Sequence, residues 1–200
     1  MDKNEIGVGP HPEPWPTDEK YDKDLLEAGD RRNVVDKYRY WTNQAIKEDM
    51  QSSSHKLEVA IENHQHDFNI GTIVRNANAF NVSKVHIIGR RQWNKRGAMV
   101  TNRYLEVVHH ESVEGFCEAI GASREIIAID NQPGAENLTD VELPPSCVLV
   151  FGGEGPGLSQ EMIEASSKMI QIEQFGSTRS VNVGVASGIV MYQWLRENSL

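Results

Sequence analysis

The apolar positions between residues 55 and 200 change repeatedly between two spacings, and this change predicts strands that alternate with helices. Unbroken apolar runs such as Cys147 to Phe151 suit strands of a sheet that is buried on both faces. Apolar residues that recur three and four positions apart, as from Asn69 to Phe80, predict helices with one buried side. The predicted strands cover residues 57–61, 85–88, 125–130, 147–151 and 169–172, and the predicted helices cover residues 69–80, 113–120, 159–167 and 182–197. This order indicates an α/β domain with a largely parallel sheet.

The first 54 residues follow a different pattern. Residues 1–17 are rich in glycine and proline and cannot continue a helix or a ladder, so this segment predicts a flexible or extended arm. Residues 18–29 and 34–50 are predicted to be helical, and three consecutive serines at 52–54 indicate a linker. We therefore expect an N-terminal arm and helical extension over residues 1–54 and the α/β domain over residues 55–200.

The net charge of −9 is unusual for a protein that binds nucleic acid, but the charge is unevenly distributed. Residues 63–110 carry seven Lys and Arg side chains against two Asp and Glu side chains, whereas both flanking regions are acidic. A local basic patch matters more for contact with phosphate groups than the total charge does. The segment from Arg90 to Gly97, where basic residues surround one tryptophan, is the best candidate for such contact; a solvated cluster of bases would give the same pattern.

Other features limit the class of protein. No apolar run approaches the roughly 18 residues of a membrane-spanning helix, and the polar, acidic N-terminus does not resemble a signal peptide. Cys117 and Cys147 form no disulfide framework, which fits a reducing cytoplasm. Four histidines occur as two pairs, His64 with His66 and His109 with His110. Because no carboxylate or cysteine accompanies them at metal-site spacing, we expect no metal ion.

Two segments within the α/β domain combine polar residues with a constrained backbone. The helix over residues 69–80 places Arg75 opposite its apolar side, where a guanidinium could reach a phosphate, although periodicity alone favours an ordinary exposed arginine. The segment from Phe151 to Ser159 joins a buried strand to a helix through a glycine-rich loop that could approach a ligand closely, and it holds Glu154. This loop lacks the Gly-Lys-Ser/Thr ending of a P-loop and the spacing of a dinucleotide-binding loop.

A third segment leads into the last predicted helix. Either Ser180 or Asn182 can cap that helix. Gly184, Ser187 and Gly188 lie on one side of it, and such small residues allow close packing, within the fold or across the seam of a dimer.

In this order and spacing, the three segments resemble motifs 1, 2 and 3 of the SPOUT methyltransferases, SpoU/TrmH branch, over about residues 56–197. The resemblance implies an α/β knot, a mostly parallel sheet whose C-terminal part forms a deep trefoil knot. It also implies a homodimer with the active site near the dimer interface. The implied cofactor is S-adenosyl-L-methionine, held in the knot mostly by backbone groups. The implied reaction is methylation of a ribose 2′-hydroxyl in transfer or ribosomal RNA.

The resemblance assigns roles to the residues at matching positions. The catalytic candidates are Arg75, Asn69, Glu154, Ser180 and Asn182. The cofactor-binding candidates are Gly152, Gly153, Gly155, Ile172, Val181 and Asn182. Arg75 is also a candidate for RNA contact, together with Arg90, Arg91, Trp93, Lys95 and Arg96 of the basic segment. The chain departs from the family pattern where Glu173 and Gln174 replace the usual Pro-Met, at the rim of the implied cofactor pocket.

For the mechanism, we expect Arg75 to clamp a phosphate and polarise the ribose hydroxyl rather than to act as a base, because a neutral guanidine is costly. A knotted protein that binds RNA or cofactor without turnover is the main alternative. A nucleotide-dependent oxidoreductase is a second alternative, and the missing dinucleotide-binding spacing argues against it. The helical extension could add RNA contacts or cover the core.

Overall fold

The computed structural model describes residues 7–64, 69–153, 155 and 157–200. The chain divides into two compact units, Met1–Ser53 and Ser54–Leu200. Among the described residues, no helix has the length and the apolar character that crossing a membrane would require.

The first unit consists of short elements joined by tight turns. Its helices are α1 (Lys23–Ala28), the 3-10 helix η1 (Asp36–Tyr38) and α2 (Asn43–Ser52). The predicted helix over residues 34–50 is therefore wrong in its first half. Tyr40 has a φ of 63°, a left-handed conformation that interrupts a helix, and the Thr42 hydroxyl caps α2 by accepting the Ala45 amide (3.1 Å). The described part of the predicted arm contains no helix and pairs with the rest of the unit, since Val8 forms an antiparallel bridge with Asp30.

A buried carboxylate organises this unit. Asp30 is fully buried and accepts hydrogen bonds from Nε (2.9 Å) and Nη2 (2.7 Å) of Arg32 and from the Tyr40 amide (2.9 Å). Burial alone would raise the pKa of Asp30, but these hydrogen bonds and the charge of Arg32 outweigh it and lower the pKa to about 2. Asp30 is thus ionised near neutral pH and holds the turn that follows α1.

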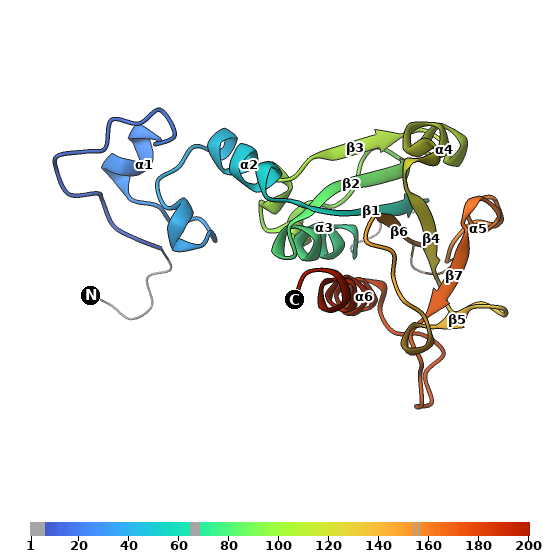
Figure 1. The fold of residues 1–200 in the computed structure, drawn as a ribbon. Helices are drawn as coiled ribbons and strands as arrows, with labels where there is room; N and C mark the ends of the chain where they lie inside the picture. Colours follow the sequence, from blue (N-terminus) through green and yellow to red (C-terminus); the bar gives the residue numbers. More distant parts are fainter. Residues whose placement is uncertain (1–6, 65–68, 154, 156) are drawn as a thin grey trace. The chain divides into compact units, whose positions relative to one another are not determined.

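The described part of the second unit contains a seven-stranded sheet in the order β3-β2-β1-β6-β4-β7-β5, and every neighbouring pair is parallel (Figure 1). The strands are β1 (His55–Asn63), β2 (Val82–Gly89), β3 (Val107–His110), β4 (Glu125–Ile129), β5 (Glu136–Asn137), β6 (Cys147–Phe151) and β7 (Lys168–Gln171). The short strands β3 and β5 were not predicted from the sequence, because β3 ends in two histidines and β5 consists of two residues, both polar.

Helices cover both faces of this sheet. Helices α3 (Asn69–Ala79) and α6 (Val183–Asn198) lie on one face, and α4 (Val113–Ile120) and α5 (Gln160–Ala165) lie on the other (Figure 1). Each face of the sheet has its own apolar core, and strand β1 contributes to both. Val59 and Ile61 pack on the α3–α6 side, whereas Ala60 packs on the α4–α5 side. This double burial explains the unbroken apolar runs in the sequence.

The strand order brings three carboxyl ends together. Strand β4 lies between β6 and β7, so the loops that follow these three strands begin side by side. In open parallel sheets, ligands bind in the crevice outside the carboxyl ends of the strands. The fold thus predicts a site at this edge.

Candidate functional site

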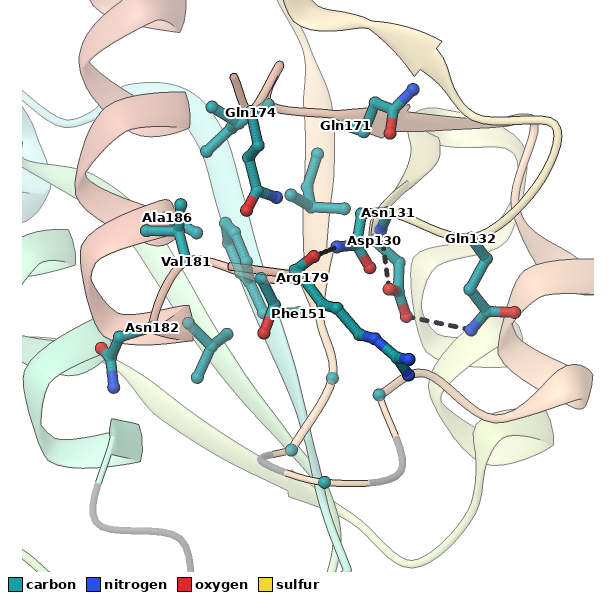
Figure 2. A pocket seen from close by; sticks show the side chains of 18 residues that line it. Asp130, Asn131, Gln132, Phe151, Gln171, Gln174, Arg179, Val181, Asn182 and Ala186 are labelled. Atoms are coloured by element: carbon teal, nitrogen blue, oxygen red, sulfur yellow. Dashed lines mark hydrogen bonds between the residues drawn. The ribbon is translucent and has the colours of Figure 1, made fainter. Parts of the chain in front are cut away.

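A cavity of about 550 Å³ lies at the carboxyl ends of β4, β6 and β7 (Figure 2). Its walls come from the ends of these strands, from the glycine-rich loop after β6, from the loop that follows β7 and from the first turn of α6. This volume falls within the range of about 300–1,000 Å³ that is typical of small-molecule sites.

The glycine-rich loop folds back on itself beside the cavity. A Cβ atom on Gly152 would lie 2.2 Å from the carbonyl carbon of Gly157, so only glycine permits this approach. Gly153 and Gly157 form a bridge, and Gly155 and Gly157 have φ angles of 100° and 70°. A substituted Gly157 would also meet a carboxylate oxygen of Asp130 at 2.7 Å. The glycines therefore allow the main chain itself to line the cavity.

Two acidic side chains hold the far end of this loop, and the sequence analysis singled out neither of them. Glu62, fully buried in β1, accepts the Ser159 amide at one oxygen (2.7 Å) and the Ser159 hydroxyl at the other (2.7 Å). Asp130, which follows β4, accepts the Leu158 amide (3.0 Å) and also lines the cavity. The sequence did offer one signal for them: each is an acidic residue at the end of an apolar strand, where a buried carboxylate needs hydrogen-bond donors.

The loop between β7 and α6 supplies the opposite wall. Ile172, Ser180 and Val181 line the cavity. Asn182 lines it as well and is fixed from both sides: its Oδ1 caps α6 by accepting the Val185 amide (3.2 Å), and its Nδ2 donates to Oδ1 of Asn69 at the start of α3 (3.0 Å). Of the two capping candidates, Asn182 is the N-cap of α6.

A second bond ties this loop to the loop after β4. The Asn131 side-chain amide donates a hydrogen bond to the main-chain carbonyl of Arg179, as Figure 2 shows. Arg179 itself is exposed and lines the cavity. Neither residue was predicted from the sequence, since neither belongs to a motif.

Most of the predicted catalytic and cofactor-binding residues meet at this cavity. The cofactor-binding candidates Gly152, Gly153, Gly155, Ile172, Val181 and Asn182 all line it, as does Ser180. Asn69 does not line the cavity but accepts a hydrogen bond from Asn182, which does. Arg75 does not line the cavity and is exposed, six residues further along α3. Glu154 lies outside the described residues.

The basic segment packs against the start of α3. A Cβ atom on Gly71 would lie 2.8 Å from the amide nitrogen of Ala98 and from the Cα of Gly97, so the segment contacts the helix backbone directly. Arg90, Arg91, Lys95 and Arg96 are exposed. Trp93 is half-buried and packs against the core, so less of its ring is open to stack on a base than the sequence suggested.

A shallow groove runs between α3 and α6. Gly184 and Gly188 let the helices approach each other, and the Asn76 side chain donates to the Gly184 carbonyl (2.9 Å) and to the Ser187 hydroxyl (3.0 Å). The small residues of α6 therefore serve packing within the fold. The groove is lined by Thr72, Asn76, Phe80, Gly184, Val185, Gly188, Ile189 and Tyr192. Its apolar members on α6 remain largely exposed: Val185 by 54%, Ile189 by 42% and Tyr192 by 49%.

Comparison with known proteins agrees with this geometry. The chain matches the model of the SpoU rRNA Methylase family over residues 56–192. The tRNA (guanosine(18)-2′-O)-methyltransferase of Escherichia coli (strain K12) is 27% identical over 159 residues, which cover 72% of this chain and 69% of that protein.

Solved structures share the fold. The TrmH/SpoU tRNA modifying enzyme of A. aeolicus superposes with a TM-score of 0.68 at 25% identity, covering 78% of this chain and 81% of that one. The AdoMet-bound rRNA methyltransferase from Sinorhizobium meliloti superposes with a TM-score of 0.63 at 21% identity, covering 74% of this chain and 59% of that one. The predicted α/β knot fold and the predicted class of RNA methyltransferase are confirmed. The chain belongs to the SpoU rRNA methylase family.

Proposed function

We propose that this chain transfers a methyl group from S-adenosyl-L-methionine to a ribose 2′-hydroxyl of transfer or ribosomal RNA. The observation that carries the proposal is the junction at Asn182, which lines the cavity, caps α6 and bonds to Asn69 on α3. This junction joins a pocket for a small molecule to the helix that bears the proposed RNA-binding arginine, Arg75.

The residues around the cavity fit this cofactor. Gly152, Gly153 and Gly155 bring the main chain to the cavity without a side chain in between. Ile172 and Val181 add apolar contact area from the opposite loop. When bound, S-adenosyl-L-methionine supplies an electrophilic methyl group, so the protein has mainly to position the hydroxyl and accommodate its proton.

The roles of the polar residues follow from their surroundings. Asn69 and Asn182 hold each other and thereby fix the position of the loop after β7. Ser180 is exposed at the cavity, where its hydroxyl could bond to the ribose. Arg75 would clamp a phosphate as a permanent cation and polarise the hydroxyl, whose proton leaves to a neighbouring group or to water. The motif resemblance makes Glu154 a further catalytic candidate at this site.

The exposed cations of the basic segment would extend the RNA contact. Arg90, Arg91, Lys95 and Arg96 are held near the start of α3 by the contact between Gly71 and the segment. Trp93 remains a candidate for stacking through the exposed part of its ring, and Lys95 lies 6.0 Å from its centroid. Phosphate contacts from such residues release counterions, so we expect RNA binding to weaken as salt increases.

We further propose that two copies of the chain associate through the groove between α3 and α6. Three exposed apolar side chains on successive turns of α6 are costly in water, and a second copy of the same groove would bury them. Arg75 lies one turn from Thr72, at the edge of this groove. A dimer would thus bring an Arg75 side chain to the seam beside the cavities.

The organisation and location of the chain are part of the same proposal. Residues 55–200 would form the methyltransferase domain, and residues 1–54 would be an N-terminal extension to it. Both cysteines are free, as expected for a protein of the reducing cytoplasm.

Transfer of labelled methyl from S-adenosyl-L-methionine to fractionated, unmodified transfer and ribosomal RNA tests the proposed activity. We expect label in one fraction and resistance of the modified position to alkaline cleavage, which marks a blocked 2′-hydroxyl. Arg75→Ala should abolish transfer, whereas Arg196→Ala, which removes another exposed helical arginine, should retain it. Binding of S-adenosylhomocysteine without label in any RNA fraction would favour the silent binding protein instead.

A measurement of the oligomeric state tests the proposed association of two copies. Light scattering after gel filtration should give about twice the chain mass of 22.5 kDa for the wild type. Ile189→Asp should lower the mass to that of one chain. Val35→Asp, a charge placed on an exposed apolar residue of the first unit, should leave the dimer intact. A monomeric wild-type protein at micromolar concentration would contradict the proposed association.

A further inference from the structure

One polar side-chain atom beside the cavity has no hydrogen-bond partner in the part of the chain that the structure describes. Among the residues that the structure describes, Oε1 of Gln174 is buried and accepts no hydrogen bond. Gln174 belongs to the loop after β7 and lines the cavity. A buried acceptor without a donor costs free energy, so such an atom at a binding site indicates a missing donor.

The preceding residue, Glu173, is bound to Thr139. The Glu173 carboxylate accepts hydrogen bonds from the main-chain amide (3.3 Å) and from the hydroxyl of Thr139. These bonds, the side-chain bond foremost, lower the pKa of Glu173. Glu173 does not line the cavity. Gln174, in contrast, lines the cavity. Figure 2 shows its carboxamide directed from the rim into the pocket.

The cavity has two chemically different sides. Gln174 lies on the side of α6, near Ala186 and Val181, whereas Asp130 and Gln132 lie on the other side (Figure 2). The exposed Arg179 also lines the cavity. A charged amino-acid group is costly to desolvate against apolar side chains and favours the side with the charges, while a flat neutral base favours the apolar side.

We propose that Gln174 reads the adenine base of the methyl donor. This inference rests on the proposed cofactor. A glutamine carboxamide presents an acceptor beside a donor, and adenine presents its N6 amino donor beside a ring-nitrogen acceptor, so the two groups pair through two hydrogen bonds. Rotation about the last side-chain torsion, which is soft in glutamine, brings the unpartnered Oε1 to the N6 amino group. Gln174 is thus a residue that determines specificity for the base, at a position where the family usually has methionine.

Calorimetric titration separates this contact from cofactor binding in general. The probes are S-adenosylhomocysteine and its 6-deamino analogue, in which purine replaces adenine and the N6 donor is absent. The wild type should bind S-adenosylhomocysteine more tightly by roughly tenfold, the discrimination expected of one such pair. Gln174→Met, which keeps the length and removes both polar atoms, should bring the ratio of the two affinities close to one. Gln174→Glu, which keeps an acceptor, should retain a preference for the amino-bearing ligand.

Gln171→Met is the matched control. Gln171 lines the same cavity, but its amide already donates to the Ala135 carbonyl (3.3 Å) and to Oδ1 of Asn137 (3.2 Å). This variant should keep the wild-type ratio of affinities. If Gln174→Met binds both probes and keeps the wild-type ratio, the assignment of Gln174 is overturned while the cofactor stands. If the wild type binds neither probe, the proposed cofactor fails as well.

Discussion

Replacing Glu62 with glutamine tests whether one buried carboxylate holds the glycine-rich loop. The two oxygens of Glu62 accept the amide and the hydroxyl of Ser159, each at 2.7 Å. Ser159 is the residue at which the loop ends and α5 begins. These two bonds tie β1 to the loop that lines the cavity.

The expected loss follows from the chemistry of the two bonds. Glutamine keeps the shape of Glu62 but replaces one accepting oxygen with an NH2 donor and removes the charge. A hydrogen bond to a charged group contributes about 1.5–3 kcal/mol, so we expect the free energy of unfolding to fall by about 2 kcal/mol. Ser159→Ala removes the hydroxyl that also caps α5 by accepting the Met162 amide (3.1 Å), which adds about 1 kcal/mol for the cap.

Urea denaturation of the two single variants and the double variant measures this interaction. Because both substitutions break the same bond, their effects should not add, and we expect a coupling energy of about 1 kcal/mol or more. Affinity for S-adenosylhomocysteine should fall in both single variants, because the loop loses its anchor. Additive effects, or a Glu62→Gln variant as stable as the wild type, would refute the reasoning.

Other consequences of the structure are open to simple measurements. A methyl group on Gly71 would lie 2.8 Å from the backbone of the basic segment, so Gly71→Ala should cost about 1–3 kcal/mol in chemical denaturation. Gly115→Ala, whose methyl meets only an ordinary contact in α4, should instead gain up to about 1 kcal/mol. Asp30 has a pKa of about 2, below its unfolded value. Its contribution of about 2 kcal/mol is therefore present above about pH 4 and lost as the pH falls toward 2, and acid unfolding of Asp30→Asn should lack this dependence. Burial, the main cause, raises the pKa of Cys147 to about 12 and also raises that of Cys117, so iodoacetamide should label both thiols slowly until the protein is unfolded. Fast labelling of the native chain would contradict the raised pKa values of these thiols.

The second unit was largely predictable from the sequence because its helices and strands bury apolar residues at regular spacings along the chain. The strand over residues 147–151 and the helix over 113–120 have the predicted bounds, since the strand is buried at every position and the helix buries positions three and four apart. The first unit was not predictable in this way. It buries few apolar side chains and depends on Asp30, whose partners Arg32 and Tyr40 are selected by hydrogen bonding rather than by periodicity.

The same distinction applies to the site. Glycines and the Asn182 cap follow local rules, so a motif can reveal them. Glu62 acts on a residue 97 positions away, and Asn182 meets Asn69 across 113 positions. Such pairs depend on which strands become neighbours in the sheet, and no local pattern encodes that. In the sequence, Gln174 was only a departure from the family pattern. The structure adds that its side-chain oxygen is buried without a hydrogen-bond donor, which suggests a contact with a ligand.

The exposed position of Arg75 leads to one more prediction. Arg75 does not line the cavity of its own chain, and it lies one helical turn after Thr72, which lines the groove that a second copy is proposed to cover. If Arg75 serves the cavity of the other copy, Arg75→Ala and a variant with a damaged pocket, Asn182→Ala, are each inactive alone. Mixed dimers then contain one intact pair, so mixing equal amounts under exchange should restore about a quarter of the wild-type sites. Activity that stays at zero after confirmed exchange would show that Arg75 and Asn182 must act within one chain.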